Sequence, residues 1–155
     1  MIFSLAMQMN VASVKKLLAL CHKMKKLQSI VHVSTAYANC NRSNVAEMIY
    51  PPPIQPAKLL DASEWMDDQV FDVLTTKIIN DRPNTYTFTK ALAEYVVSQE
   101  TKELPLAIIR PSIVGSSWRE PIPVRSKKNK TEFCFFCTNQ FFLRVGLTIT
   151  MVQVV

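Results

Sequence analysis

The chain has 155 residues, of which 48% are hydrophobic, and a formal net charge of +6. This length supports one globular domain with a buried core and is too short for two. The charge would suit a protein that binds polyanions, but residues 125–155 hold five basic residues and one acidic residue and so supply +4 of it. Because the rest of the chain carries little net charge, we expect no nucleic-acid partner.

The cysteine content and the apolar segments exclude two further classes of protein. The four cysteines are too few and too scattered for a secreted disulfide scaffold, so free thiols in a reducing compartment are expected: Cys21, Cys40, Cys134 and Cys137. Cys134 and Cys137 have the spacing of zinc ligands, but a structural site needs four ligands, and no metal site is expected. No run reaches the roughly 18 apolar residues that cross a bilayer, so the chain should not span a membrane.

The first quarter of the chain predicts a helix followed by a strand. Hydrophobic residues at spacings of four and three define one face of a helix that runs to about Met24: Met7, Val11, Val14, Leu18 and Cys21. Asn10 lies beside this face. The run from Ile30 to Val33 is short and rich in β-branched residues, which is typical of a strand buried on both faces.

The middle of the chain has a looser pattern. Residues 36–83 predict a long excursion beyond the strand, with a rigid proline-rich stretch and a short helix that begins at Ser63. Excursions of this kind often carry binding surface.

The pattern becomes regular again at residue 84. Asn84 or Thr85 is expected to cap a helix that reaches about Glu100, and residues 106–110 predict a second buried strand that Pro111 stops. Helix, strand, long loop, helix and strand in this order predict an α/β fold with a doubly wound parallel sheet.

Two residues at the start of the second long helix form a candidate catalytic pair. Tyr86 precedes Lys90 by four residues, so one helical turn separates them. A phenol exchanges protons poorly at neutral pH unless a neighbouring positive charge stabilises its anion, and an ammonium one turn away does so. The spacing alone is common in helices that have no catalytic role.

Hydroxyl groups at the end of the first strand strengthen this hypothesis. Ser34 and Thr35 follow the strand, at the edge of the sheet where ligands bind in open parallel folds. A hydroxyl there could hold a carbonyl oxygen beside the phenol. The alternative is that both residues simply end a strand, as hydroxyl residues often do.

Five stretches together resemble the extended short-chain dehydrogenase/reductases, and specifically the animal fatty acyl-CoA reductases. They are HVSTAYANCN, YPPP, EWMDD, DRPNTYTFTKALAEYVV and AIIRPSIVGSSWREPIP. The resemblance runs from about Ala6 to Pro123. It implies NADPH-dependent reduction of a long-chain fatty acyl-CoA to a primary alcohol.

The resemblance also implies roles for individual residues. Tyr86 would donate the proton to the carbonyl oxygen, Lys90 would assist the phenol and bind the nicotinamide ribose, and Ser34 or Thr35 would orient the carbonyl. Asn10 would support a proton-relay water or be an ordinary polar residue of its helix. Four residues are implied as cofactor contacts: Pro111, Ser112, Ile113 and Val114.

The glycine content departs from the family pattern. The chain has two glycines, Gly115 and Gly146, so it contains no G-x-G-x-x-G turn for a cofactor pyrophosphate. We therefore expect residues 1–123 to be a partial Rossmann-type reductase domain without its first strands, and residues 124–155 to be a divergent basic and aromatic tail. We expect a chain of this kind to be marginally folded, soluble or aggregated by itself, and inactive alone.

Two alternatives differ from a fatty acyl-CoA reductase. One is a related dehydrogenase or epimerase that acts on sugars or sterols, which would share the Ser, Tyr and Lys residues but not EWMDD or the proline block. The other is a non-catalytic truncated product that pairs with a full-length reductase. The family resemblance implies the peroxisomal membrane as the location of the full enzyme.

Overall fold

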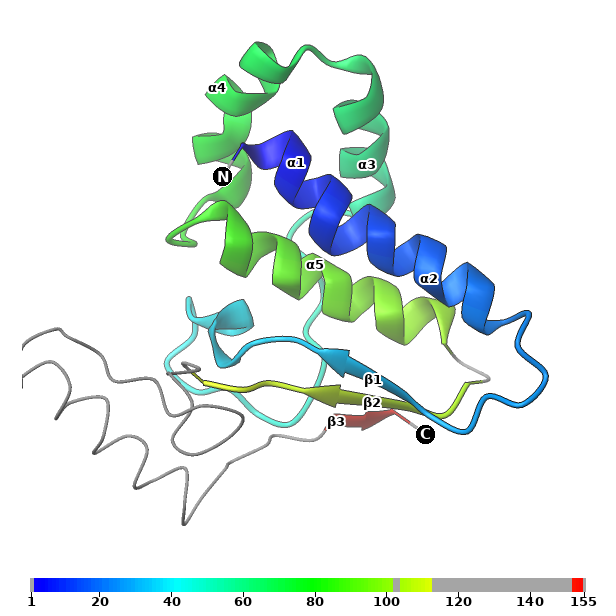
Figure 1. Ribbon diagram of the computed structural model, residues 1–155. Helices are drawn as coiled ribbons and strands as arrows, with labels where there is room; N and C mark the ends of the chain where they lie inside the picture. The colour runs from blue at the N-terminus through cyan, green and yellow to red at the C-terminus, as the bar shows by residue number, and fades with distance from the viewer. Residues whose placement is uncertain (1, 102–103, 113–151, 155) are drawn as a thin grey trace, which may run out of the picture.

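The computed structural model describes residues 2–101, 104–112 and 152–154, and it has a mixed α/β architecture (Figure 1). Helices lie on one side of a small sheet, with α5 nearest to it. The elements are α1 (Phe3–Met7), η1 (Gln8–Ala12), α2 (Ser13–Cys21), β1 (Ile30–Val33), η2 (Ala36–Asn39), α3 (Pro56–Trp65), α4 (Asp68–Ile79), α5 (Thr85–Glu100), β2 (Leu106–Ile109) and β3 (Val152–Val154).

The elements α1, η1 and α2 form one continuous helix that contains a π-helical turn. The residues at both junctions keep right-handed helical dihedral angles, so the chain does not break between them. The predicted apolar face is confirmed, because Met7, Val11, Leu18 and Cys21 are all buried. The helix ends at Cys21, about one turn before the predicted end at Met24.

The sheet has the strand order β1, β2, β3. Strands β1 and β2 are parallel, and Val33 is in register with Ile109. This confirms the parallel pairing that the sequence predicted for the two apolar runs. Strand β3 lies antiparallel to β2, so three residues of the predicted tail belong to the sheet.

The expectation that β1 is buried on both faces is wrong. Val31 and Val33 are 54% and 53% exposed, whereas the alternate residues Ile30 and His32 turn toward the helices and are partly buried. The physical reason is that the helices of the described part of the chain cover one face of the sheet (Figure 1). Parallel sheets usually have helices on both faces.

Residues 36–83 are more helical than expected. Helix α3 begins at Pro56, a residue suited to the first helical turn because it has no N–H to leave unpaired. Ser63 lies inside this helix and does not begin one. The next helix, α4, begins at Asp68 and is capped by Asp67, whose carboxylate accepts a hydrogen bond from the Gln69 amide at 2.9 Å.

Helix α5 begins as predicted and packs into the core. The Asn84 side chain accepts a hydrogen bond from the Thr87 amide at 2.9 Å, which satisfies one free donor of the first turn. Phe88 meets the Phe3 ring edge-on at 5.8 Å, and Phe3 stacks on Phe71 at 4.8 Å. Among the described helices, none is long and apolar enough to cross a membrane.

Candidate active site at the strand ends

Tyr86 and Lys90 lie on the first two turns of α5, which begins on the side of the sheet where β1 and β2 end (Figure 1). The Lys90 ammonium is 6.0 Å from the centre of the Tyr86 ring, and Tyr86 is 43% exposed. Lys90 Nζ also donates a hydrogen bond to the Val33 carbonyl at 3.1 Å. Lys90 therefore connects the tyrosine turn of α5 to the last residue of β1.

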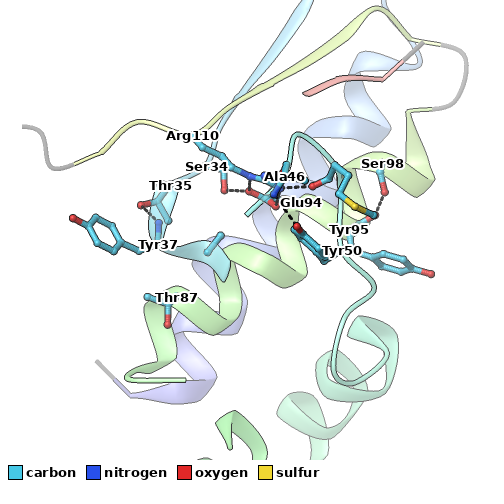
Figure 2. Close-up of polar contacts among 12 residues, drawn as sticks. Ser34, Thr35, Tyr37, Ala46, Tyr50, Thr87, Glu94, Tyr95, Ser98 and Arg110 are labelled. Carbon is cyan, nitrogen blue, oxygen red and sulfur yellow. Dashed lines mark hydrogen bonds and ion pairs between the residues drawn. The ribbon is translucent and has the colours of Figure 1, made fainter. Parts of the chain in front are cut away.

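The two hydroxyl residues after β1 differ in how they are bonded. Ser34 donates its proton to the Glu94 carboxylate in the interior of the protein. Thr35 Oγ1 accepts a hydrogen bond from the Tyr37 amide at 3.3 Å, so this bond leaves the Thr35 proton for another acceptor. Figure 2 shows Ser34 turned toward Glu94 and Thr35 lying apart from that contact.

Glu94 and Arg110 form a buried ion pair that the sequence interpretation missed. Arg110 Nε and Nη2 donate to the two carboxylate oxygens of Glu94 at 2.8 and 2.7 Å, and both side chains are 2% exposed (Figure 2). Such a pair persists in a core only when its geometry and further hydrogen bonds compensate for desolvation. Glu94 and Arg110 each lie within an apolar stretch of the sequence. Because buried charges are normally paired, these two positions could have indicated the ion pair.

Asn10 reaches α5 from the π-helical turn. Its Nδ2 donates to Thr89 Oγ1 at 2.9 Å, and Thr89 in turn donates to the Thr85 carbonyl at 2.8 Å. Single π turns within α-helices are frequent at functional sites. The structure therefore brings Asn10 to the turn of α5 that carries Tyr86, and its amide is hydrogen-bonded there.

Arg82 fixes the start of α5 against the loop after β1. Its Nη1 donates to the Ala38 carbonyl and, at 3.4 Å, to the Thr87 carbonyl. The side chain is buried. This contact holds η2 beside the turn that contains Tyr86.

The expected cofactor-contact segment begins beside the same edge of the sheet. The Pro111 carbonyl accepts a hydrogen bond from the Ala36 amide at 3.0 Å, which extends the pairing of β1 and β2 beyond the strands. Pro111 is partly buried and Ser112 is exposed. Ile113 and Val114 lie outside the described residues.

His32 lies on the helix-facing side of β1, next to Lys90 and Glu94. Burial and, to a smaller extent, the Lys90 charge lower the pKa of His32 from 6.5 to about 4, while Glu94 opposes the change. The imidazole is therefore neutral at pH 7, and its buried Nε2 has no hydrogen-bond partner among the described residues. Burial also lowers the pKa of Lys90, an effect that Glu94 opposes.

We expect His32 to make the fold sensitive to acid. The unfolded imidazole charges near pH 6.5, whereas the folded one stays neutral until about pH 4. The free energy of unfolding is therefore not reduced by His32 above pH 6.5, and it decreases as the pH falls from 6.5 toward 4, because the unfolded chain takes up the proton first. At pH 5 this linkage lowers the free energy of unfolding by about 2 kcal/mol relative to pH 7.

Urea unfolding at both pH values measures the effect. His32→Asn should show a smaller decrease in the free energy of unfolding between pH 7 and pH 5. His22→Asn, which replaces an exposed imidazole, should show the same decrease as wild type. An identical pH dependence in wild type and His32→Asn would contradict the prediction.

The thiols of the described residues are free. Cys21 is buried and Cys40 is exposed, while Cys134 and Cys137 lie outside these residues. Within the part of the chain that the structure describes, no group of three His, Cys, Asp or Glu side chains could hold a metal ion.

A parallel strand pair covered by helices, with polar side chains at its carboxyl edge, is the arrangement of α/β nucleotide-binding domains. Residues 3–151 match the family described as male sterility protein, an NAD-binding domain family. The chain belongs to the fatty acyl-CoA reductase family. The matched residues extend beyond Pro123, the boundary expected from the sequence.

Several curated relatives carry the reductase name. The chain is 61% identical over 118 residues to fatty acyl-CoA reductase 1 of Xenopus laevis, which covers 76% of this chain and 23% of that protein. Over the same coverage it is 57% identical to human fatty acyl-CoA reductase 1 and 52% identical to mouse fatty acyl-CoA reductase 2. The chain thus spans 23% of the length of these relatives.

Proposed function

We propose that this chain supplies the proton-transfer residues of an NADPH-dependent reductase that converts long-chain fatty acyl-CoA to a primary alcohol. The observation that carries the proposal is the connection of Tyr86 and Lys90 to the end of β1 through the Val33 carbonyl. The family membership and the reductase names of the relatives support the substrate class.

We assign the orientation of the substrate carbonyl to Thr35. The sequence had left Ser34 and Thr35 as equal candidates. Ser34 is already bonded to Glu94, whereas Thr35 has a proton that its bond to Tyr37 does not use. A donor held in place before the reaction stabilises the negative charge that develops on the oxygen.

Tyr86 is the proposed proton donor to that oxygen. The ammonium of Lys90, one helical turn away, stabilises the phenolate that remains after each proton transfer. In the first reduction, hydride addition to the carbonyl carbon and protonation of its oxygen by Tyr86 give a thiohemiacetal. Its C–S bond then breaks and the hydroxyl proton passes to sulfur, which releases the aldehyde and the CoA thiol. In the second reduction, hydride adds to the aldehyde and Tyr86 protonates the resulting alkoxide to give the alcohol.

The residues at this edge fit a dihydronicotinamide riboside. Lys90 Nζ uses one of its three protons on Val33, and the other two suit ribose hydroxyls. Pro111 lies beside Ala36, close to the strand end where the ring would rest. NADPH supplies one hydride to each of the two reductions.

The cofactor pyrophosphate needs residues other than these 155. Gly115 and Gly146 are the two glycines of the sequence, and they cannot form the turn whose amides hold a pyrophosphate at a helix N-terminus. We therefore expect the chain by itself to bind NADPH weakly. Strand β1 lies at an edge of the sheet and its outer face is exposed, so it suits a partner that pairs with this edge and covers this face, whether another part of a longer reductase or a second polypeptide. The peroxisomal membrane remains the location we expect for the complete enzyme.

A chimera tests the substrate class. Here this chain's residues replace the 118 matching residues of the Xenopus laevis relative, so that the relative supplies the rest of the enzyme. We expect NADPH oxidation with palmitoyl-CoA and none above background with a sugar nucleotide or a sterol ketone. Oxidation with the sugar nucleotide or sterol, and none with palmitoyl-CoA, would support the related dehydrogenase instead. The isolated chain, assayed in parallel, should be inactive.

A further inference from the structure

Arg110 joins three separate parts of the chain at the carboxyl edge of the sheet. Besides its two bonds to Glu94 on α5, its Nη2 donates to the Met48 carbonyl at 2.8 Å and its Nη1 to the Ala46 carbonyl at 3.3 Å. Glu94 accepts the proton of Ser34 as well. Arg110, which follows β2, therefore connects the loop of residues 45–50 to α5 and, through Glu94 and Ser34, to the end of β1 (Figure 2).

The loop of residues 45–50 is closed on itself at the same place. The Ala46 amide donates to the Tyr50 hydroxyl at 2.8 Å, and the Arg42 guanidinium lies 4.1 Å from the centre of the Tyr50 ring. The loop has no helix or strand of its own. These polar contacts, those to Arg110, and the packing of Ile49 against the core cluster that contains Leu18 and Ile108 hold it in place. Removing the Arg110 contacts would loosen the backbone around Ala46 and Met48, while Ile49 remains packed against the core.

The same loop exposes apolar side chains, and Arg110 and Glu94 link its backbone to Ser34 at the end of β1. Val45 is 41% exposed and Met48 is 48% exposed, and Arg110 holds the backbone on either side of residue 47. A substrate with a polar reacting group and a long alkyl chain needs both kinds of surface close together. Unbranched methionine adapts well to an alkyl chain.

We propose that Arg110, held by Glu94, is a positioning residue that places the loop of residues 45–50 as an apolar contact for the alkyl chain of the acyl substrate. This inference rests on the proposed function for its substrate. It assigns Val45 and Met48 to substrate binding and Arg110 to the placement of their loop. The carboxylate of Glu94 binds both Arg110 and Ser34, so one buried group holds the loop, through Arg110, and the Ser34 hydroxyl after β1.

Arg110→Lys in the chimera separates loop placement from charge. A lysine keeps the positive charge beside Glu94, but its single nitrogen cannot also span the two carbonyls that the planar guanidinium reaches. We expect faster hydrogen exchange at the amides of residues 45–50. The KM for palmitoyl-CoA should rise roughly tenfold, the scale of lost apolar contacts in a pocket, while the KM for butanoyl-CoA and for NADPH changes less than about twofold.

Met48→Ser provides an independent variant that retains every Arg110 contact. It should raise the KM for palmitoyl-CoA selectively and leave exchange in residues 45–50 unchanged. Lys77→Arg, at an exposed position on α4, is the matched control and should alter neither quantity.

Two results would overturn the inference. Wild-type hydrogen exchange in Arg110→Lys would show that the guanidinium does not hold the loop, whether or not any acyl-CoA is reduced. Equal changes in the KM for palmitoyl-CoA and for butanoyl-CoA in Met48→Ser would exclude a contact between Met48 and the alkyl chain. By contrast, failure of the proposed function would appear as an unmodified chimera that reduces no acyl-CoA.

Discussion

Tyr86→Phe in the chimera should lower the kcat for palmitoyl-CoA reduction by at least about 100-fold, the lower end of what a general acid contributes. The substitution removes one oxygen and keeps the ring. Tyr86 is 43% exposed and lies outside the buried core, so the fold should tolerate the change. NADPH affinity should stay within about twofold of wild type, because the ribose contact assigned to Lys90 is unaffected.

Tyr95→Phe is the matched control. Tyr95 lies nine residues further along α5, which places it on the opposite side of the helix from Tyr86. Its kcat should equal that of wild type. Wild-type turnover by Tyr86→Phe would mean that the phenol takes no part in proton transfer.

Lys90→Met is the second change with a large expected effect, and it should impair both turnover and cofactor binding. Methionine has a similar length but lacks the ammonium, so the variant loses the hydrogen bond to Val33 and the charge near Tyr86. We expect the kcat to fall at least about 100-fold and the Kd for NADPH to rise roughly tenfold, because one group serves two roles.

Kinetics and a fluorescence titration with NADPH measure these two quantities separately. Lys77→Met, which removes an exposed lysine from α4, should leave both unchanged. A Lys90→Met variant with a wild-type Kd and a reduced kcat would exclude the ribose contact, and one with a wild-type kcat would exclude its assistance to Tyr86.

The helix and strand periods predicted the elements that carry the site. The spacing from Met7 to Cys21 predicted the N-terminal helix and its buried face, and Asn84 predicted the start of α5. These features depend on local preferences and on a repeating apolar face, which a sequence displays directly. The position of Tyr86 and Lys90 on one helix followed from the same period.

The environment of those elements was harder to predict, because it depends on contacts between distant residues. An apolar, β-branched run such as Ile30 to Val33 looks the same whether helices cover one face of its sheet or both. The sequence therefore predicted a fully buried β1, although its outer face is exposed. The loose pattern of residues 36–83 likewise concealed α3 and α4, since the α4 surface exposes Val70 and Val73 and weakens the apolar period.

The bonding of the site hydroxyls could not be predicted either. Ser34 and Thr35 are adjacent and chemically similar, and the residue that distinguishes them, Glu94, is 60 positions from Ser34. The pairing of Glu94 with Arg110 requires the packing of α5 on the end of β2. Fixing the partner of a buried charge needs the tertiary structure.

Product analysis of the chimera with palmitoyl-CoA and NADPH tests the central claim most directly. Mass spectrometry should detect hexadecanol, with two molecules of NADPH oxidised for each molecule of alcohol, and Tyr86→Phe should form none above background while it still binds NADPH. Formation of hexadecanol by Tyr86→Phe at the wild-type rate would contradict the assignment of proton transfer to this chain.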